Sequence, residues 1–346
     1  MEKTKKYIIN LILFLTLIIL TFSSILKEQD ISEIFNIVNS VKKEFIIIAI
    51  GCMSLYMVCE AINIGRTLKA LNENSTFLKN LKYALIGFFF SSITPAASGG
   101  QPMQIYYMHK EKISVASSTL ALLINLTCVQ IVTISVALFS LIFNYSYMNS
   151  FLIGFFILGI TLNASALALL LISILSKRMT RGLINIVRKI LKFFKVKNIE
   201  DKQIKLENEL KKYQNSAEYI KENKILILKN LLTTYIQYIT YYSISYWVYR
   251  SFGLSSHSIF EITTMQSVLY ATVSGIPSPG AVGVSEGGYL AIFETVFPGE
   301  LLNGAMLLSR GVNFYLFVAI SALVVIINAM RIKKENIIIN NEIEEK

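Results

Sequence analysis

Two short stretches of this chain place helix-breaking residues inside long apolar runs. They read TPAASGGQPMQ from Thr94 to Gln104 and PSPGAVGVSEGG from Pro277 to Gly288, and they contain four of the five prolines. In a bilayer every peptide N–H and C=O group needs a partner, so non-helical backbone is tolerated there only where protein buries it or where it borders a wet cavity. We therefore expect the two stretches to form the functional site.

The composition favours a membrane protein. Of the 346 residues, 54% are hydrophobic and only 16% are charged, which is too apolar for an ordinary soluble domain. The first apolar run, Tyr7–Leu26, exceeds the core of a cleavable signal and no small-residue cleavage site follows it, so we expect it to remain as a spanning helix. No His, Cys and Asp residues have metal-ligand spacing, and we expect no metal, no cofactor and no catalytic residue.

Six apolar runs are long enough to cross a bilayer, which needs about 20 residues. They are Tyr7–Leu26, Phe45–Ile64, Ser118–Phe143, Phe151–Leu175, Ile225–Tyr249 and Gly304–Met330. Two further apolar stretches, Tyr83–Met108 and Ile259–Phe297, are interrupted near their middles by the helix-breaking motifs. Each half of about ten residues reaches roughly 15 Å, near the midplane, so we predict a re-entrant hairpin in each.

The distribution of Lys and Arg predicts the orientation. Segment 176–224 is the most basic and should be cytoplasmic, and so should the amino terminus and the tail 331–346. Basic residues flank the first interrupted stretch on both sides, so it should enter from the cytoplasm and return. The segments beside the second interrupted stretch are nearly free of Lys and Arg, so that stretch should enter from the opposite face.

The resulting order of span, hairpin and span occurs twice, over residues 45–143 and 225–330 of one domain, 1–346. Opposite entry faces make this an inverted repeat, the architecture of many alternating-access transporters. Pro95 to Gly99 and Pro279 to Gly283 also share a four-residue spacing. We therefore predict an all-α polytopic membrane protein with six spans, two opposed re-entrant hairpins and cytoplasmic amphipathic helices.

The basic segment 176–224 combines apolar residues at helical spacing with Lys and Arg between them. This pattern is typical of amphipathic helices on a membrane surface, held by anionic headgroups. Apolar residues recur again over 199–220 and predict a second such helix. The net charge of +11 owes much to this segment, so we expect anionic lipids as partners and no nucleic acid.

The hairpin tips supply most of the candidate site. Glycine permits positive φ, proline suits the opening of a helix, and the amino terminus of a half-helix attracts a phosphate. The alternative is that Gly and Pro only allow helices to pack closely. The candidate residues are Thr94, Pro95, Ser98, Gly99, Gly100, Gln101, Pro102, Gln104, Pro277, Pro279, Gly280, Gly283, Ser285, Glu286 and Gly287.

Three ionisable residues fall at depth in the apolar runs: Glu60, Glu286 and Arg310. Each costs at least about 2.5 kcal/mol at the bilayer centre unless it is paired or hydrated. We expect Glu286 and Arg310 to pair, with the arginine holding a lipid phosphate when the carboxylate releases it; a purely structural ion pair is the alternative. The tyrosines between Tyr235 and Tyr246 suit packing, an interfacial belt or a cavity wall, of which packing is favoured.

The two motifs, in this order and about 180 residues apart, resemble the transmembrane domain of the lysylphosphatidylglycerol synthase/flippase family, the multiple peptide resistance factor group. The resemblance spans nearly the whole chain. It assigns importance to Pro95, Gly99, Gly100, Gln101, Pro102, Pro279, Gly280, Gly283 and Glu286. Relatives often carry a basic residue before the motif glutamate, where this chain has Ser285.

The resemblance implies a lipid flippase of the bacterial inner membrane, acting on anionic or aminoacylated phospholipids and contributing to resistance to cationic antimicrobial peptides. Full-length relatives add a cytoplasmic aminoacyltransferase domain that moves lysine from lysyl-tRNA to phosphatidylglycerol. We expect this chain to be a short form without that domain.

Two alternatives stay open. One is phosphatidylglycerol lysyltransferase activity with a separate soluble aminoacyltransferase. The other is a non-transporting scaffold for a glycolipid pathway, with a glycosyltransferase as partner. A homo-oligomer is also compatible with the sequence.

Overall fold

The computed structural model describes residues 16, 36, 39–144, 150–175 and 199–344. Every regular element in these ranges is helical, which confirms the predicted all-α class. The long helices are α3 (Lys43–Ala70), α6 (Val115–Asn144), α7 (Ser150–Leu175), α10 (Lys224–Ser251) and α14 (Leu316–Glu344). The shorter helices are α4 (Phe77–Ser92), α5 (Gly100–Lys110), α9 (Ile199–Glu222), α11 (Ile259–Val273), α12 (Val284–Phe293) and α13 (Gly299–Arg310).

Within the described ranges, four helical stretches are long and apolar enough to cross a membrane. They are Lys43–Ala70, Val115–Asn144, Leu152–Ile174 and Gly299–Met330, and they correspond to four of the six predicted spans. The predicted span Tyr7–Leu26 lies outside the described residues. The predicted span Ile225–Tyr249 forms α10, a helix with many tyrosines that is not among the four.

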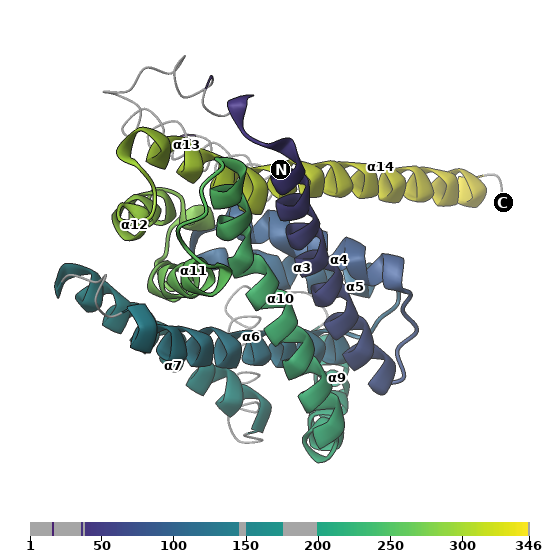
Figure 1. Cartoon of the computed structure of the whole chain (residues 1–346). Coiled ribbons are helices and arrows are strands. Elements are labelled where there is room, and N and C mark those ends of the chain that lie inside the picture. Colours follow the sequence, from purple (N-terminus) through teal and green to yellow (C-terminus); the bar gives the residue numbers. More distant parts are fainter. Residues whose placement is uncertain (1–15, 17–35, 37–38, 145–149, 176–198, 345–346) are drawn as a thin grey trace.

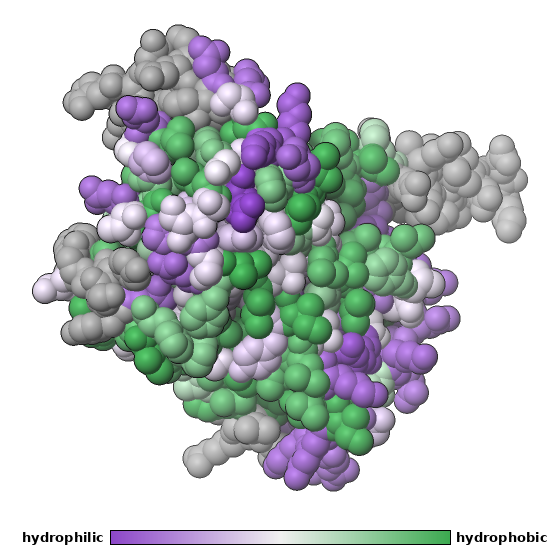
Figure 2. All heavy atoms as spheres, viewed as in Figure 1, coloured by the Kyte–Doolittle hydropathy of each residue, from purple (hydrophilic) through white to green (hydrophobic). Residues whose placement is uncertain are grey.

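Large apolar side chains face outward on these helices. Ile157 and Leu169 of α7 are 59% and 62% exposed, and Ile236 of α10 is 56% exposed. Figure 2 shows hydrophobic residues over much of the visible face, with hydrophilic residues gathered toward its edges. A soluble monomer rarely exposes so much apolar surface, whereas a bilayer solvates it.

Local sequence signals set several helix starts. The Asn223 side chain accepts a hydrogen bond from the Leu226 amide at 3.1 Å and begins α10. The Ser258 hydroxyl accepts one from the Glu261 amide at 3.2 Å and begins α11. Such caps satisfy amide groups that have no partner within the helix.

The two predicted repeats pack against one another in a reciprocal way. Helices α3 and α10, which open the two repeats, lie side by side (Figure 1). Helix α4 of the first repeat packs on α14 of the second, while α11 of the second packs on α6 of the first. The largest apolar core joins α3 and α10 to α11, α12 and α13, with Met53, Tyr249 and Phe293 fully or almost fully buried.

The described part of the basic segment forms α9. Tyr213, Ala217 and Ile220 are buried on one side of this helix, against a cluster that includes Leu120 of α6. This confirms a helix over the predicted range 199–220, with a buried side from Tyr213 to Ile220. The first amphipathic helix predicted in the basic segment, before residue 199, lies outside the described residues.

Candidate functional site

The first helix-breaking motif separates α4 from α5. Helix α4 ends at Ser92, Pro95–Ala97 form one 3-10 turn, and α5 begins at Gly100. The Thr94 hydroxyl donates a hydrogen bond to the Phe90 carbonyl at 2.6 Å and accepts one from the Gly99 amide at 2.9 Å. A single threonine therefore satisfies one backbone group on each side of the break, as burial requires.

The second motif repeats this backbone between α11 and α12, where Pro279–Ala281 form the 3-10 turn. The residue before the turn is extended in both motifs, with φ and ψ of −124° and 142° at Thr94 and of −112° and 147° at Ser278. The middle residue is left-handed in both, with 51° and 32° at Ala96 and 60° and 15° at Gly280. The shared Pro-to-Gly spacing thus corresponds to a shared local conformation.

Three alanines in these turns hold a left-handed backbone. The φ angles are 51° at Ala96, 53° at Ala97 and 52° at Ala281. Residues with a Cβ atom seldom adopt this region, and such strain concentrates at functional sites. The two turns contact each other, so this backbone lies where the two motifs meet.

Glycines allow the motifs to approach their neighbours. A Cβ atom on Gly100 would lie 2.9 Å from the Gly87 carbonyl of α4, and one on Gly280 would lie 3.0 Å from a ring carbon of Phe314. Close packing of helices, the alternative to a binding role, therefore explains why Gly100 is a glycine. It also explains in part why Gly280 is a glycine.

Glu286 and Arg310 form a buried ion pair. Nε of Arg310 donates to Oε1 of Glu286 at 2.7 Å, and the Glu286 residue is 0% and Arg310 6% exposed. Glu286 also accepts a bond from the Gly283 amide at 2.7 Å and one from the Tyr315 hydroxyl at 3.0 Å. The Gly283 bond occupies an amide at the start of α12 that we expected to be free for a phosphate.

Arg310 is positioned by an unusual helical segment. It is the last residue of α13, and a π-helical turn, Gly311–Tyr315, connects it to α14. The guanidinium carbon lies 4.3 Å from the ring centre of Phe314, and Nη2 donates to the Gly280 carbonyl at 3.2 Å. The predicted span Gly304–Met330 is thus interrupted by a π turn, a feature that often marks functional sites.

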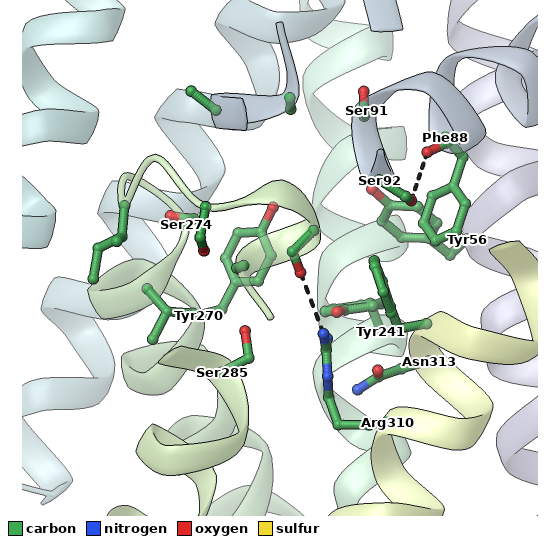
Figure 3. A pocket seen from close by; sticks show the side chains of 18 residues that line it. Tyr56, Phe88, Ser91, Ser92, Tyr241, Tyr270, Ser274, Ser285, Arg310 and Asn313 are labelled. Carbon is green, nitrogen blue, oxygen red and sulfur yellow. Dashed lines mark hydrogen bonds between the residues drawn. The ribbon is translucent and has the colours of Figure 1, made fainter. Parts of the chain in front are cut away.

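Arg310 lines a cavity of about 190 Å³, which we call the arginine cavity. Its wall combines the two motif turns, Ser285 and Tyr241. Figure 3 shows Arg310 beside Tyr241 and Asn313, with Tyr270 across from it. Tyr241 is therefore part of a cavity wall, one of the alternatives for the tyrosine-rich face of α10.

Glu60 lines an adjoining cavity of about 540 Å³, which we call the glutamate cavity. Tyr56, Ala96 and Tyr270 border both cavities. The Glu60 carboxylate accepts hydrogen bonds from Asn125 at 2.6 Å and from Gln237 at 3.0 Å. Glu60, the third charge predicted to be buried, is only partly buried. It faces the same region as the ion pair but is held by amides.

The other predicted residues divide between the cavities and the periphery. Gln101 and Gln104 line the glutamate cavity, and Ser285 lines the arginine cavity. Ser98, Pro102, Pro277 and Gly287 are exposed and line neither cavity. Gly287 lies on the first turns of α12, where an added Cβ atom would meet nothing within 4 Å.

Several residues of the site were missed by sequence reasoning. Asn125 and Gln237 hold Glu60, and Tyr315 and Phe314 surround Arg310. A buried amide in an apolar run needs a polar partner. The positions of Asn125 and Gln237 in apolar runs therefore predict that each contacts another polar group. Nothing in the sequence marked Phe314, whose place follows from the π turn.

The arrangement suits binding of a charged group more than bond-making chemistry. A guanidinium offers five N–H donors in a fork that matches a phosphate, and two of its nitrogens already hold Glu286 and the Gly280 carbonyl. Within the described residues, no group of three or more His, Cys, Asp or Glu side chains could hold a metal ion. The chemistry of Arg310 therefore suits an anion, and the Glu286 carboxylate occupies it in this structure.

Comparison with known proteins places the chain among membrane proteins. Residues 7–321 match the family described as "Lysylphosphatidylglycerol synthase TM region". A similar protein is "UPF0104 membrane protein PH1989" of Pyrococcus horikoshii, which is 24% identical over 295 residues that cover 82% of this chain and 87% of that protein. The family match includes both helix-breaking motifs, Glu60, Glu286 and Arg310. This chain belongs to the lysylphosphatidylglycerol synthase transmembrane-region family.

Proposed function

We propose that this protein moves a phospholipid between the leaflets of the bacterial inner membrane, as a lipid flippase. Its substrate is an anionic or aminoacylated phospholipid such as lysylphosphatidylglycerol, and its activity contributes to resistance to cationic antimicrobial peptides. The observation that carries the proposal is the buried Arg310 guanidinium, which lines a cavity where two strained helix breaks meet. The description of the matched family, "Lysylphosphatidylglycerol synthase TM region", supports the choice of lipid.

In this proposal the phosphate competes with Glu286 for Arg310. A buried ion pair gains little net free energy, because desolvation offsets the attraction. A phosphate that replaces the carboxylate keeps the guanidinium paired, and Glu286 retains bonds from Gly283 and Tyr315. Exchange between carboxylate and phosphate therefore keeps Arg310 paired, and it leaves Glu286 held by two neutral hydrogen-bond donors in place of its countercharge.

The proposed transport path rests on an inverted repeat. Residues 45–143 and 225–330 form two repeats, each with a re-entrant hairpin, and the hairpins enter from opposite faces; both termini are cytoplasmic. Matching turns at Pro95–Ala97 and Pro279–Ala281 support this arrangement. So does the reciprocal packing of α4 on α14 and of α11 on α6, because a two-fold axis exchanges one contact for the other.

Leaflet-specific labelling tests the proposal. Cells that make lysylphosphatidylglycerol and express the chain are treated with an amine reagent that does not cross the membrane, and the labelled fraction of the lipid is measured. We expect Arg310→Ala to lower this fraction to that of cells without the chain. Arg310→Lys should retain part of the activity, because it keeps the charge but loses the planar fork.

Arg250→Ala is the matched control. Arg250 lies at the end of α10, 5.5 Å from the Phe45 ring centre, and lines neither cavity. Normal lipid sidedness in Arg310→Ala cells, at normal protein levels, would contradict transport and favour a scaffold. Formation of lysylphosphatidylglycerol by the purified chain from lysyl-tRNA and phosphatidylglycerol would instead favour a lysyltransferase.

A further inference from the structure

Glu60 lies at the junction of three helices. It belongs to α3, its Oε1 accepts from Nδ2 of Asn125 on α6, and its Oε2 accepts from Nε2 of Gln237 on α10. Both bonds place an N–H group on a carboxylate oxygen. This arrangement suits the ionised side chain, because an ionised carboxylate only accepts hydrogen bonds.

The amides that hold Glu60 leave their own oxygens without a partner. Oδ1 of Asn125 and Oε1 of Gln237 are buried and have no hydrogen bond within the described residues, and neither has Oε1 of Gln130. Asn125 and Gln130 line the glutamate cavity. Asn125 and Gln237 are 4% and 0% exposed. Turning either amide around would set an oxygen against the carboxylate, so the orientation is fixed by Glu60.

No positive charge of the described chain compensates Glu60. Its carboxylate takes part in none of the ion pairs among the described residues. Arg66, on the same helix, donates to Asn63, Asn230 and Thr233. Arg310 is paired with Glu286. The Glu60 carboxylate is therefore held by two amides whose oxygens have no donor, and Gln130 adds a third such oxygen in the lining of the cavity. Buried acceptors without a donor are costly.

We propose that the glutamate cavity binds a cation of single charge, an alkali ion or the primary ammonium group of a lipid headgroup, at Glu60. Oxygen ligands suit both, and one carboxylate with neutral amide oxygens balances one positive charge. Tyr56, Tyr238 and Tyr270 line the cavity and add aromatic rings, which attract cations over their faces. The site is distinct from Arg310 and, on the proposed function, adds a cation site to the anion site in the arginine cavity.

Cation-dependent stability tests this site without reference to transport. The full chain is placed in nanodiscs of phosphatidylglycerol alone, and its Tm is followed with increasing NaCl or methylammonium chloride at constant ionic strength, balanced by N-methylglucamine chloride. A cation that binds only the folded protein raises the Tm with a saturable dependence. We expect Glu60→Gln to raise the cation concentration that gives half of the Tm increase by at least about tenfold.

Glu261→Gln is the control, because Glu261 pairs with His257 at the start of α11, away from the cavity. A saturable effect of Na⁺ supports an alkali-ion site, and an effect of methylammonium alone supports a headgroup ammonium site. No saturable effect of either cation, or an equal effect in Glu60→Gln, would overturn the proposal. Gln130→Leu serves as a second variant if Glu60→Gln does not fold. It removes an acceptor from the cavity and keeps both hydrogen bonds to Glu60. An unchanged dependence of the Tm on the cation in Gln130→Leu would also contradict the proposal.

Discussion

Nε of Arg310 lies 2.7 Å from Oε1 of Glu286, and the two side chains come from helices α13 and α12, which flank a loop of the second repeat. The carboxylate is fully buried, and two further hydrogen bonds reach it. The pair therefore fixes the start of α12 to the π turn that precedes α14. Stability should depend on this pair, and under the proposed function anion binding should depend on it too.

Removing both partners of this pair should cost less than the sum of the two single removals. Arg310→Met leaves a buried carboxylate unpaired and should lower the free energy of unfolding by about 3 kcal/mol. In the double variant with Glu286→Gln, the loss should fall short of the sum of the single losses by more than about 1 kcal/mol. Denaturant unfolding in detergent measures each value, and additive losses would contradict a coupled pair.

Two glycines of the second motif, Gly280 and Gly287, differ sharply in their surroundings. Gly280→Ala should lower stability by about 1–3 kcal/mol, because φ is 60° and an added Cβ atom meets Phe314. Gly287→Ala should be neutral or stabilising by up to about 1 kcal/mol, because the position is helical and open. Melting of the two variants side by side checks the contrast, and an equal loss in both would contradict it.

Acid should weaken the ends of the first hairpin. Burial alone would raise the pKa of Glu111, but hydrogen bonds from Lys82 and Tyr83 outweigh it, so this pKa lies below the ordinary value of 4.5. A carboxyl whose pKa is lower in the folded protein than in the unfolded chain stabilises the folded protein above about pH 4.5. This contribution to stability is lost as the pH falls through the pKa of the folded protein. Glu111→Gln should therefore lose less stability than the parent between neutral pH and pH 3, measured by unfolding at each pH. An equal loss in parent and variant would argue against this contribution.

The proposed opposed hairpins predict opposite accessibility of their outer ends. Asn74 precedes α4 and Ser255 precedes α11, and both are exposed. Single cysteines at these positions, in a chain without Cys52, Cys59 and Cys128, should react with a membrane-impermeant maleimide from opposite faces. Asn74→Cys should be labelled only in inverted vesicles and Ser255→Cys only in intact cells. Labelling of both from one face would contradict the inverted repeat.

Sequence reasoning found the breaks because their chemistry is local. Pro95 and Pro279 restrict φ and remove an amide donor, so a continuous helix there is unfavourable whatever surrounds it. Ser98 was expected in the site as a side-chain donor, but it is exposed beside the turn. The direction of a side chain in an irregular turn depends on dihedral angles that tertiary contacts select, and the motif letters do not encode them.

The sequence by itself determined the membrane class, the four confirmed apolar helices, the two breaks and the buried charges Glu286 and Arg310. It could do so because hydropathy, helix propensity and the cost of burial act on each segment separately. Only the tertiary structure decided which groups meet. It set Glu286 against Arg310 through the π turn at Gly311–Tyr315, and it gave Glu60 two amide partners from α6 and α10. Contacts between segments far apart in the chain depend on how whole helices pack, and no local pattern fixes that packing.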